Sequence, residues 1–256
     1  LSEGLYCGLF FILFINANLY QARKMQTRSG ESSWALKMRL LFIILFFSSF
    51  SFSAEGDFNC GTIECDNFSA DTTDLASLQS GLTTYMNNCY GCHSLKYSRY
   101  NRVAKDLKIP IEIYQENLIF DGSKPGELMN ISLNEKDAVE WIGAKPPDLT
   151  LEARIRKPEW IYTYLRTYYP DASRPYGVNN KVYQNVSMPN VLEDLQLNLS
   201  AAEFDKVIYD LTNFLVYVAD PSANERKRIG VYVLLFLLLF TSFAYLTYRE
   251  FKKELK

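Results

Sequence analysis

Apolar residues recur at helical spacing in the stretch LASLQSGLTTYM, residues 75–86. Residues 71–74, with the sequence DTTD, precede this stretch and offer side chains that can cap the first turn of a helix. The pattern therefore predicts an amphipathic helix that leads directly into Cys89.

Two more helices are predicted by terminal signals of the same kind. Pro158 suits the first turn of a helix over EWIYTYLRTYY, residues 159–169, and Pro170 is expected to end it. Ser200 and Glu203 form a capping box ahead of a sustained apolar stripe. The segment DPS after that stripe breaks the helical pattern.

The stretches between these helices are rich in turn-forming residues, as in GAKPPDL and YPDASRPYGVNN. No segment of any length alternates apolar and polar residues, so strands are not expected. The predicted fold class is mostly α, with short helices on long loops. A body of this kind often needs a further component at its centre.

Two apolar runs indicate export and membrane anchoring. Residues 38–54 begin with a basic start, continue as LLFIILFF and end in small residues, which is typical of a secretory signal peptide. Residues 229–248 contain no charge, and twenty residues at ~1.5 Å rise span the roughly 30 Å of a bilayer core. Residues 1–37 carry another apolar run and are interpreted as a non-native upstream extension, the alternative being an extra membrane segment.

The predicted organisation then has three further parts: an exported body over residues 55–224, a basic flank and membrane anchor over 225–248, and a short tail over 249–256. The body holds 24 Asp and Glu against 15 Lys and Arg, a net charge near −9, although the whole chain is at −2. An acidic body argues against nucleic acid as a partner and for cationic partners attracted over long range.

The motif Cys89-Tyr90-Gly91-Cys92-His93 contains the only histidine of the chain. Two thiols at this spacing can add to the vinyl groups of one haem, and the adjacent imidazole then ligates the iron. A thiol–disulfide active site is a competing interpretation, but such motifs stand at a helix start after a strand. Here the motif closes a helix, so the sequence predicts one covalently bound haem c.

Because there is no second histidine, the other axial ligand is expected to be a methionine sulfur, which also raises the reduction potential. Met86 shares a predicted helix with Cys89 and cannot reach the opposite haem face. Met188, followed by Pro189 in an extended loop, is the favoured ligand. Met129 remains the alternative, with core packing as its ordinary role.

Several longer motifs make the chain resemble the cytochrome c1 family, the haem subunit of the cytochrome bc1 complex, in its bacterial form. They are NNCYGCHSLKYSRYNR (87–102), WIGAKPPDLTLEARIR (141–156), EWIYTYLRTYYPDASRPYGVNN (159–180) and QNVSMPNVL (184–192), followed by the membrane anchor. The resemblance covers the chain from about residue 74 to the C-terminus and implies a class I-like c-type cytochrome domain.

The resemblance also implies roles for individual residues. Cys89 and Cys92 would bind the haem covalently, His93 would be its proximal ligand and Met188 its distal ligand.

Three further residues follow from the same resemblance. Pro147, within PPDL, would line the haem crevice, and Trp160 would be the aromatic residue beside the haem. Arg156 would lie near a haem propionate, although pairing with Glu152 at i−4 is an equal alternative.

Cys60 and Cys65 lie ahead of the haem helix, where the resemblance gives no fixed pair. In an oxidising compartment a small-loop disulfide is expected, rather than free thiols or a metal site.

The function implied by the resemblance is a one-electron relay in the bacterial inner membrane, with the haem domain in the periplasm and the C-terminus in the cytoplasm. The Rieske iron–sulfur protein would donate the electron, a soluble or tethered cytochrome c would accept it, and the anchor would lie in the lipid bilayer beside cytochrome b. This redox subunit shows no acid–base or nucleophilic machinery of its own. The main alternative is a membrane-anchored c-type cytochrome that serves a terminal oxidase or another reductase, and the other is a thiol oxidoreductase.

Overall fold

The structure is a computed structural model that describes residues 59–254 of the chain. The predicted signal peptide, residues 38–54, and the proposed upstream extension, residues 1–37, lie outside the described residues.

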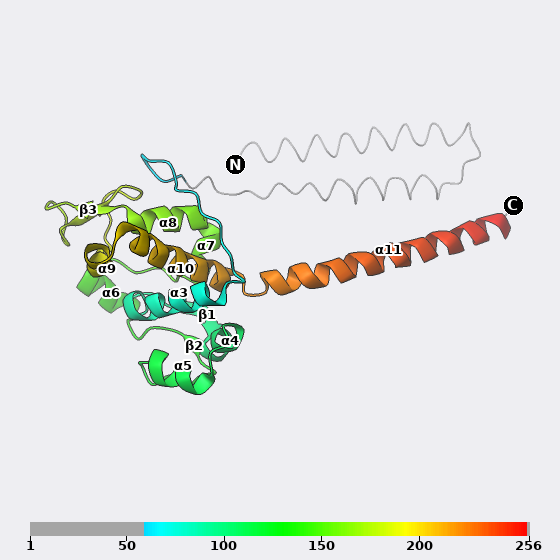
Figure 1. Cartoon of the computed structure of the whole chain (residues 1–256), viewed down its shortest axis with the longest axis horizontal. Coiled ribbons are helices and arrows are strands. Elements are labelled where there is room, and N and C mark those ends of the chain that lie inside the picture. Colours follow the sequence, from blue (N-terminus) through cyan, green and yellow to red (C-terminus); the bar gives the residue numbers. More distant parts are fainter. Residues whose placement is uncertain (1–58, 255–256) are drawn as a thin grey trace. The chain divides into compact units, whose positions relative to one another are not determined.

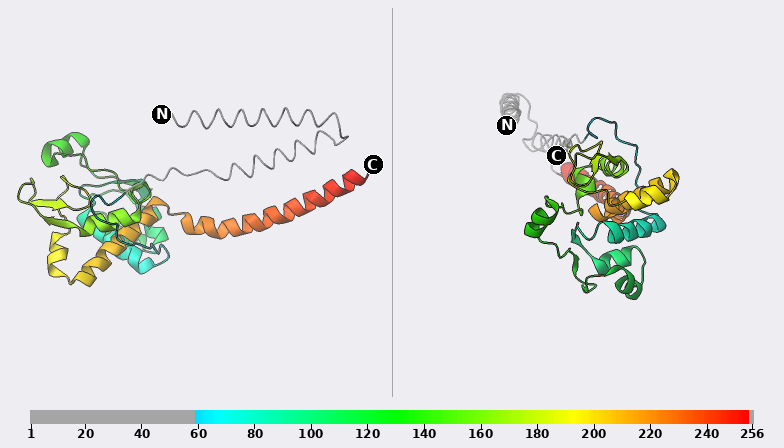
Figure 2. Two further views of the ribbon diagram at one scale, coloured as in Figure 1. Left: turned by 90° about the horizontal axis from the view of Figure 1, so that it is seen from above. Right: turned by 90° about the vertical axis from the view of Figure 1, so that its left-hand side faces the viewer.

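Two helices, α3 (Leu75–Asn88) and α10 (Ala201–Ala219), pack against each other at the centre of the domain (Figures 1 and 2). The N-terminus of α3 is capped by Asp74, whose side chain accepts a hydrogen bond from the backbone N–H of Ser77. The N-terminus of α10 carries the complete capping box of Ser200 and Glu203. Both predicted helices are confirmed.

Gly81 of α3 lies where α3 and α10 cross, and its lack of a side chain allows the two helices to pack closely. A Cβ atom built on Gly81 would lie 2.0 Å from the carbonyl oxygen of Asp210 and 2.7 Å from Cβ of Phe214. Around this crossing the largest fully buried aliphatic side chains of the two helices are Leu78, Leu82, Ile208 and Leu211. The core of the domain therefore starts from this contact.

A buried carboxylate links the same two helices. Asp210 is 3% exposed, and its Oδ1 accepts a hydrogen bond of 2.6 Å from Oγ of Ser77. Lys206, one turn earlier on α10, pairs with both carboxylate oxygens. Both oxygens of the buried carboxylate therefore have hydrogen-bond partners, and Asn213 donates to Oγ of Ser77 at 3.0 Å.

Shorter elements surround the central pair on long connecting segments, as the sequence predicted. They are β1 (Leu95–Arg99), α4 (Tyr100–Asp106), α5 (Ile111–Leu118), β2 (Leu128–Met129), α6 (Glu135–Ile142), α7 (Glu152–Ile155), α8 (Pro158–Arg166), β3 (Tyr168–Pro170), β4 (Val178–Asn180) and α9 (Glu193–Asn198). The expectation of no strands was wrong: β1 pairs antiparallel with β2, and β3 with β4. These strands are too short to show an alternating pattern.

The end of α8 also differs from the prediction. Pro158 does occupy its first turn, but the helix ends at Arg166 rather than continuing through residue 169. Asn180, on β4, donates a hydrogen bond of 2.7 Å to the carbonyl oxygen of Tyr164 and so satisfies a carbonyl of the last turn. Residues 168–170, which form β3, pair with β4, so a contact between distant residues overrides the local helical pattern.

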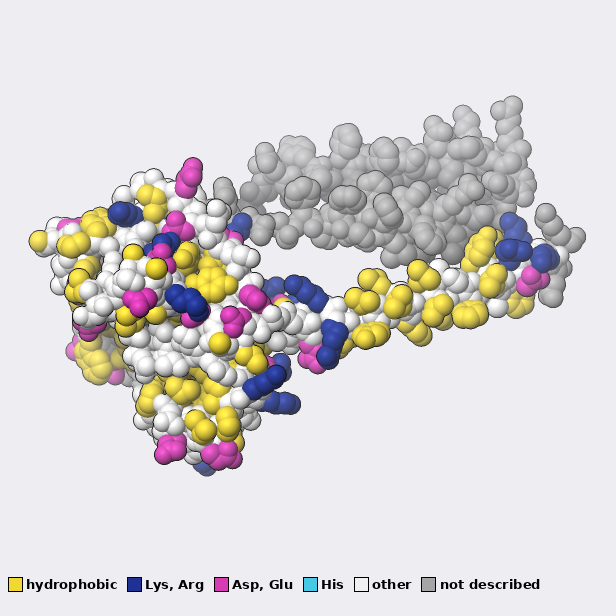
Figure 3. Space-filling model, viewed as in Figure 1, with side chains coloured by type: hydrophobic (Ala, Val, Ile, Leu, Met, Phe, Trp, Pro, Cys, Tyr) yellow, Lys and Arg dark blue, Asp and Glu magenta, His cyan; other side chains and the backbone are white. Residues whose placement is uncertain are grey.

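The long C-terminal helix α11 (Ala223–Glu254) begins after the predicted break at DPS. It is the one described helix that is long and apolar enough to cross a membrane, with a mean hydropathy of 2.3 in its most apolar part. Figure 3 shows hydrophobic side chains along most of its length. The predicted apolar span, residues 229–248, lies inside this helix.

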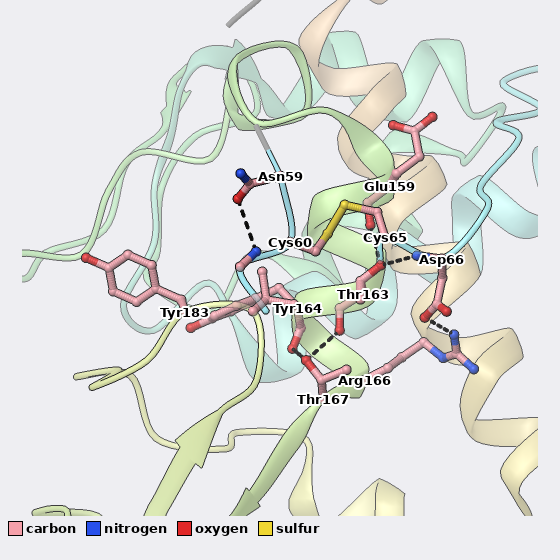
Figure 4. Close-up of a disulfide and its surroundings, with 12 residues drawn as sticks. Asn59, Cys60, Cys65, Asp66, Glu159, Thr163, Tyr164, Arg166, Thr167 and Tyr183 are labelled. Atoms are coloured by element: carbon pink, nitrogen blue, oxygen red, sulfur yellow. Dashed lines mark hydrogen bonds and ion pairs between the residues drawn. A yellow bond between two sulfur atoms is a disulfide. The ribbon is translucent and has the colours of Figure 1, made fainter. Parts of the chain in front are cut away.

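Cys60 and Cys65 form the small-loop disulfide that the sequence predicted (Figure 4). The residue after it, Asp66, donates its backbone N–H to Oγ1 of Thr163 on α8 at 2.8 Å. Its carboxylate accepts a hydrogen bond of 2.6 Å from Arg166, at the end of the same helix. The disulfide thus fixes a small loop whose next residue is bound to α8.

Removal of this disulfide is expected to lower the free energy of unfolding. For Cys60→Ser/Cys65→Ser we expect a loss of about 2 kcal/mol. The cross-link restricts the unfolded chain, and for a loop this short the lost conformational entropy corresponds to about that free energy. Urea unfolding of the purified chain in detergent measures the change. Thr62→Ala, an exposed position inside the same loop, is the matched control and should leave the urea midpoint unchanged.

Candidate functional site

A cavity of about 360 Å³ lies between the C-terminal end of α3, helix α8 and the loop after β4. Most of its lining side chains are aliphatic or aromatic. The lining includes all seven predicted site residues: Cys89, Cys92, His93, Pro147, Arg156, Trp160 and Met188. The structure therefore brings together residues from four separate stretches of the chain.

The C-x-x-C-H motif forms the turn that ends α3. Cys89 is the C-terminal cap of this helix, and its carbonyl oxygen accepts hydrogen bonds from the backbone N–H groups of Cys92 at 3.0 Å and His93 at 2.9 Å. This turn places both thiols and the imidazole along one wall of the cavity. Both cysteines are free thiols, with Cys89 buried and Cys92 exposed.

The imidazole of His93 is held by one backbone contact. Its Nδ1 lies 2.8 Å from the carbonyl oxygen of Pro147, so Nδ1 carries the proton and Nε2 keeps a lone pair. Burial lowers the pKa of His93, although the Pro147 carbonyl and the nearby carboxylates of Glu152 and Asp148 act in the opposite direction. The ring is thus held in the neutral form that can ligate a metal.

The PPDL segment is fixed against the residues that follow His93. Leu149 donates its backbone N–H to the carbonyl oxygen of Ser94 at 3.0 Å. The carboxylate of Asp148 accepts hydrogen bonds from the backbone N–H of Lys96 at 2.8 Å and of Thr150 at 3.1 Å. These bonds set the position of Pro147 and therefore the orientation of the imidazole.

Helix α8 contributes the aromatic wall of the cavity. The rings of Trp160 and Tyr164 stack with centroids 4.9 Å apart, and the guanidinium of Arg156 lies 4.6 Å from the Trp160 centroid. Nε of Arg156 also donates to Oε2 of Glu152 at 2.8 Å. Arg156 therefore pairs with Glu152, one of the two arrangements that the sequence left open, and it also lines the cavity.

Met188 and Met129 have different surroundings. Sδ of Met188 accepts a hydrogen bond of 3.6 Å from the hydroxyl of Tyr164. Met129 is 0% exposed, pairs with Leu95 in the sheet of β1 and β2, and does not line the cavity. Of the methionines within residues 59–254, Met188 is the one that reaches the cavity.

Sequence reasoning missed three tyrosines at the site: Tyr164 and Tyr183, which line the cavity, and Tyr85, which contacts His93. Tyr164 follows Trp160 by four residues, so the helical spacing of the predicted α8 was a signal that could have found it. Tyr85 is fully buried and donates its hydroxyl to the carbonyl oxygen of His93 at 2.6 Å. No local signal separates Tyr85 from an ordinary core residue of α3.

The chemistry of these groups fits haem c. The motif supplies two thiols, an imidazole with a free Nε2 and, across an apolar cavity, a thioether. Burial raises the pKa of the Cys89 thiol to about 12, with a smaller effect from Cys92. A thiol oxidoreductase needs a thiolate near neutral pH, and this thiol is protonated there, so the environment disfavours that alternative.

The domain is helical, and one apolar cavity brings together a C-x-x-C-H turn, an imidazole and a thioether. Within residues 59–254, one helix is long and apolar enough to cross a membrane. These features define the class of membrane-anchored c-type cytochromes. The model of the Cytochrome C1 family matches residues 67–255. The chain belongs to the cytochrome c1 family.

Proteins from other organisms are similar to this chain in sequence. The chain is 44% identical to cytochrome c1 of Allochromatium vinosum over 211 residues, which cover 72% of this chain and 86% of the relative. It is 34% identical to a Nitrosomonas europaea protein named ammonia monooxygenase gamma subunit, over 75% of this chain and 89% of that protein. Mitochondrial cytochrome c1 of Saccharomyces cerevisiae is 29% identical over 65% of this chain and 63% of its own length.

Family membership establishes the cofactor and the general activity. The chain binds haem c covalently and is an electron-transfer haem subunit of the bc1 type. Its C-terminal helix fits a single-pass membrane anchor of a bacterial cytochrome c1.

Proposed function

We propose that this chain relays single electrons from the Rieske iron–sulfur protein to a soluble or membrane-tethered cytochrome c. The relay would use a haem c bound by Cys89, Cys92, His93 and Met188. The observation that supports the proposal is the cavity itself, which unites the C-x-x-C-H turn with a methionine loop far away in the sequence.

Each residue has a separate task in this proposal. The thiols of Cys89 and Cys92 would form the two thioether bonds, Nε2 of His93 would bind one face of the iron, and Sδ of Met188 the other. When bound, haem c supplies a one-electron iron couple. The Pro147 carbonyl would keep the imidazole in its ligating tautomer through the 2.8 Å contact with Nδ1. The apolar lining would exclude water and so favour the less charged, reduced state.

Arg156 and Trp160 would complete the site. The guanidinium of Arg156 lies on the cavity wall beside Glu152, from where it could neutralise a haem propionate. Trp160 is 8% exposed and stacked on Tyr164, so its ring is held in place at the cavity wall.

The proposed arrangement in the cell follows from the anchor and the predicted signal peptide. The body, residues 55–224, would lie in the periplasm, α11 beside cytochrome b in the inner membrane, and the tail, residues 249–256, in the cytoplasm. The net charge of the body, near −9, would attract a basic cytochrome c and make its association rate depend on salt.

Purification of the tagged chain from its own membranes tests the electron partners. We expect cytochrome b and the Rieske protein to co-purify with it, and quinol to reduce its haem only while the Rieske protein is present. A haem band that survives acid–acetone extraction shows covalent attachment and serves as the control for intact protein. Co-purification with a terminal oxidase, without cytochrome b, would instead support the alternative of an oxidase-linked cytochrome.

A further inference from the structure

The helical domain joins α11 through a corner that is held by side-chain contacts. Asp220, the C-terminal cap of α10, accepts two hydrogen bonds from the guanidinium of Arg226, at 3.1 and 2.6 Å. The amide of Asn224 donates to Oγ1 of Thr72, just before α3, at 2.9 Å. The first turn of α11 is thus tied to both central helices of the domain.

Cationic side chains from two other helices reach the same corner. Arg154 of α7 lies 3.9 Å from the carboxylate of Asp220. Arg102 of α4 pairs with Asp106 at 2.5 Å, and Asp106 also accepts a hydrogen bond of 2.9 Å from Tyr217 of α10. The contacts place α4 and α7 beside the start of the membrane helix.

We call the exposed cations around this corner the junction face. It consists of Arg102 and Arg154, of Lys105, which follows Arg102 by three residues on α4, and of Arg226, Lys227 and Arg228 of α11. Figure 3 shows Lys and Arg side chains gathered around the start of α11.

The junction face is positive although the body is acidic. Its six cations are accompanied by the carboxylates of Asp106, Asp220 and Glu225, and Asp71 and Asp74 lie within two residues of Thr72, which leaves a net charge of +1. Within the described part of the chain, Lys105, Lys227 and Arg228 form no ion pair. Residues 55–224 as a whole carry a net charge near −9, so the sign of the charge changes at the membrane side of the domain.

The distance along α11 between its basic residues and its apolar run sets the height of the junction face above the bilayer core. At ~1.5 Å per residue, the three basic residues 226–228 lie within roughly 5 Å of Ile229, where the apolar run begins. A bilayer about 40–45 Å thick around a core of about 30 Å leaves roughly 5–7 Å of headgroups on each side. The basic residues of α11 therefore lie in the headgroup layer.

The cations of α4 and α7 come close to the same layer. Ala223, the first residue of α11, lies roughly 9 Å above Ile229 along the helix axis. Arg154 contacts Asp220 just before that first turn, and Glu225 within the turn interacts electrostatically with Arg102. Both cations therefore lie on the membrane side of the domain, where headgroup charges act over a Debye length of ~8–10 Å. Their long side chains can extend toward the membrane while the helices stay in place.

We propose that the junction face binds the phosphate groups of anionic phospholipids and so seats the haem domain on the bilayer surface. Arginine suits this task because its guanidinium can donate two parallel hydrogen bonds to one phosphate. The proposal depends on the anchor and is independent of the electron partners proposed above.

Lipid association with the full-length holo chain tests the proposal. The probes are spin-labelled phosphatidylglycerol and phosphatidylcholine, each at trace level in phosphatidylcholine bilayers that contain the purified chain. Electron paramagnetic resonance then gives the association of each lipid with the protein surface. We expect the chain to prefer phosphatidylglycerol, and Lys105→Gln/Arg154→Gln to lower that preference by up to about fivefold per removed charge at low salt.

A matched variant separates the junction face from total charge. Lys136→Gln/Lys181→Gln removes two exposed lysines from α6 and from the loop after β4, away from α11 (Figure 1), and should leave the lipid preference unchanged. An equal loss in both variants would overturn the proposal. So would a preference that responds to Lys227→Gln/Arg228→Gln but not to Lys105→Gln/Arg154→Gln, because the anchor flank alone would then bind the lipid.

Discussion

In the Met188→Leu variant, the midpoint potential of the haem is expected to fall on the order of 0.2 V, a fraction of the roughly 0.8 V over which axial ligands set haem potentials. The haem should stay attached, because Cys89 and Cys92 hold it independently of the axial ligand. Leucine fills a similar volume but offers no lone pair to the iron. The variant is therefore expected to change the midpoint potential of the haem and to leave its covalent attachment unchanged.

The structure supplies a matched control for this experiment. Met129 is the same residue type but is 0% exposed and packs away from the cavity, so Met129→Leu should leave the potential unchanged. As a volume-conserving exchange in the core, it should cost less than about 1.5 kcal/mol of stability. Redox titration of reduced-minus-oxidised spectra on purified membranes measures both variants. An unchanged potential in Met188→Leu, or a fall in Met129→Leu, would contradict ligation by Met188.

The Gly81→Ala variant is expected to lose about 3 kcal/mol of unfolding free energy or more, because overpacking a close helix crossing forces the backbone to shift. The added Cβ would lie 2.0 Å from the carbonyl oxygen of Asp210 and 2.6 Å from its carbonyl carbon. Both are backbone atoms of α10, so a side-chain rotation cannot relieve the contact. The helices α3 and α10 would have to separate, and the C-x-x-C-H turn at the end of α3 would move with them.

Gly126→Ala is the control for this prediction. A Cβ at Gly126 has no atom within 4 Å, so the substitution tests the loss of a glycine without a steric conflict. Urea unfolding of the holo chain, followed by haem absorbance, compares the two variants. A Gly81→Ala protein with the urea midpoint of the wild-type chain would show that α3 and α10 can move apart without loss of stability. That result would contradict the prediction.

Local signals in the sequence correctly predicted the starts of the central helices. Asp74 caps α3 and Ser200 caps α10 as expected, because a cap depends on side chains within three residues of each other. All seven predicted site residues line the cavity, but for different reasons. The C-x-x-C-H residues are neighbours in the chain, and Met188 was favoured by elimination among the methionines, whereas Pro147, Arg156 and Trp160 were named from the family resemblance.

Local signals failed where contacts between distant residues decide the structure. The helical pattern continues past Arg166, but β4 pairs with residues 168–170 and ends α8 earlier. Tyr85 contributes to the site through a hydrogen bond to His93 that its position on an apolar helix face does not reveal.

The sequence by itself determined the chemistry of this protein: the thiols and imidazole of one short motif, the caps of its central helices and the apolar length of its anchor. Each depends on spacing along the chain, which covalent geometry translates directly into position. Only the tertiary structure decided that Met188 rather than Met129 reaches the cavity. It also decided that Gly81 lies where α3 and α10 cross, and that cations of α4 and α7 lie beside those of α11. These are packing contacts between residues distant in sequence, and packing selects them by shape and burial rather than by any local pattern.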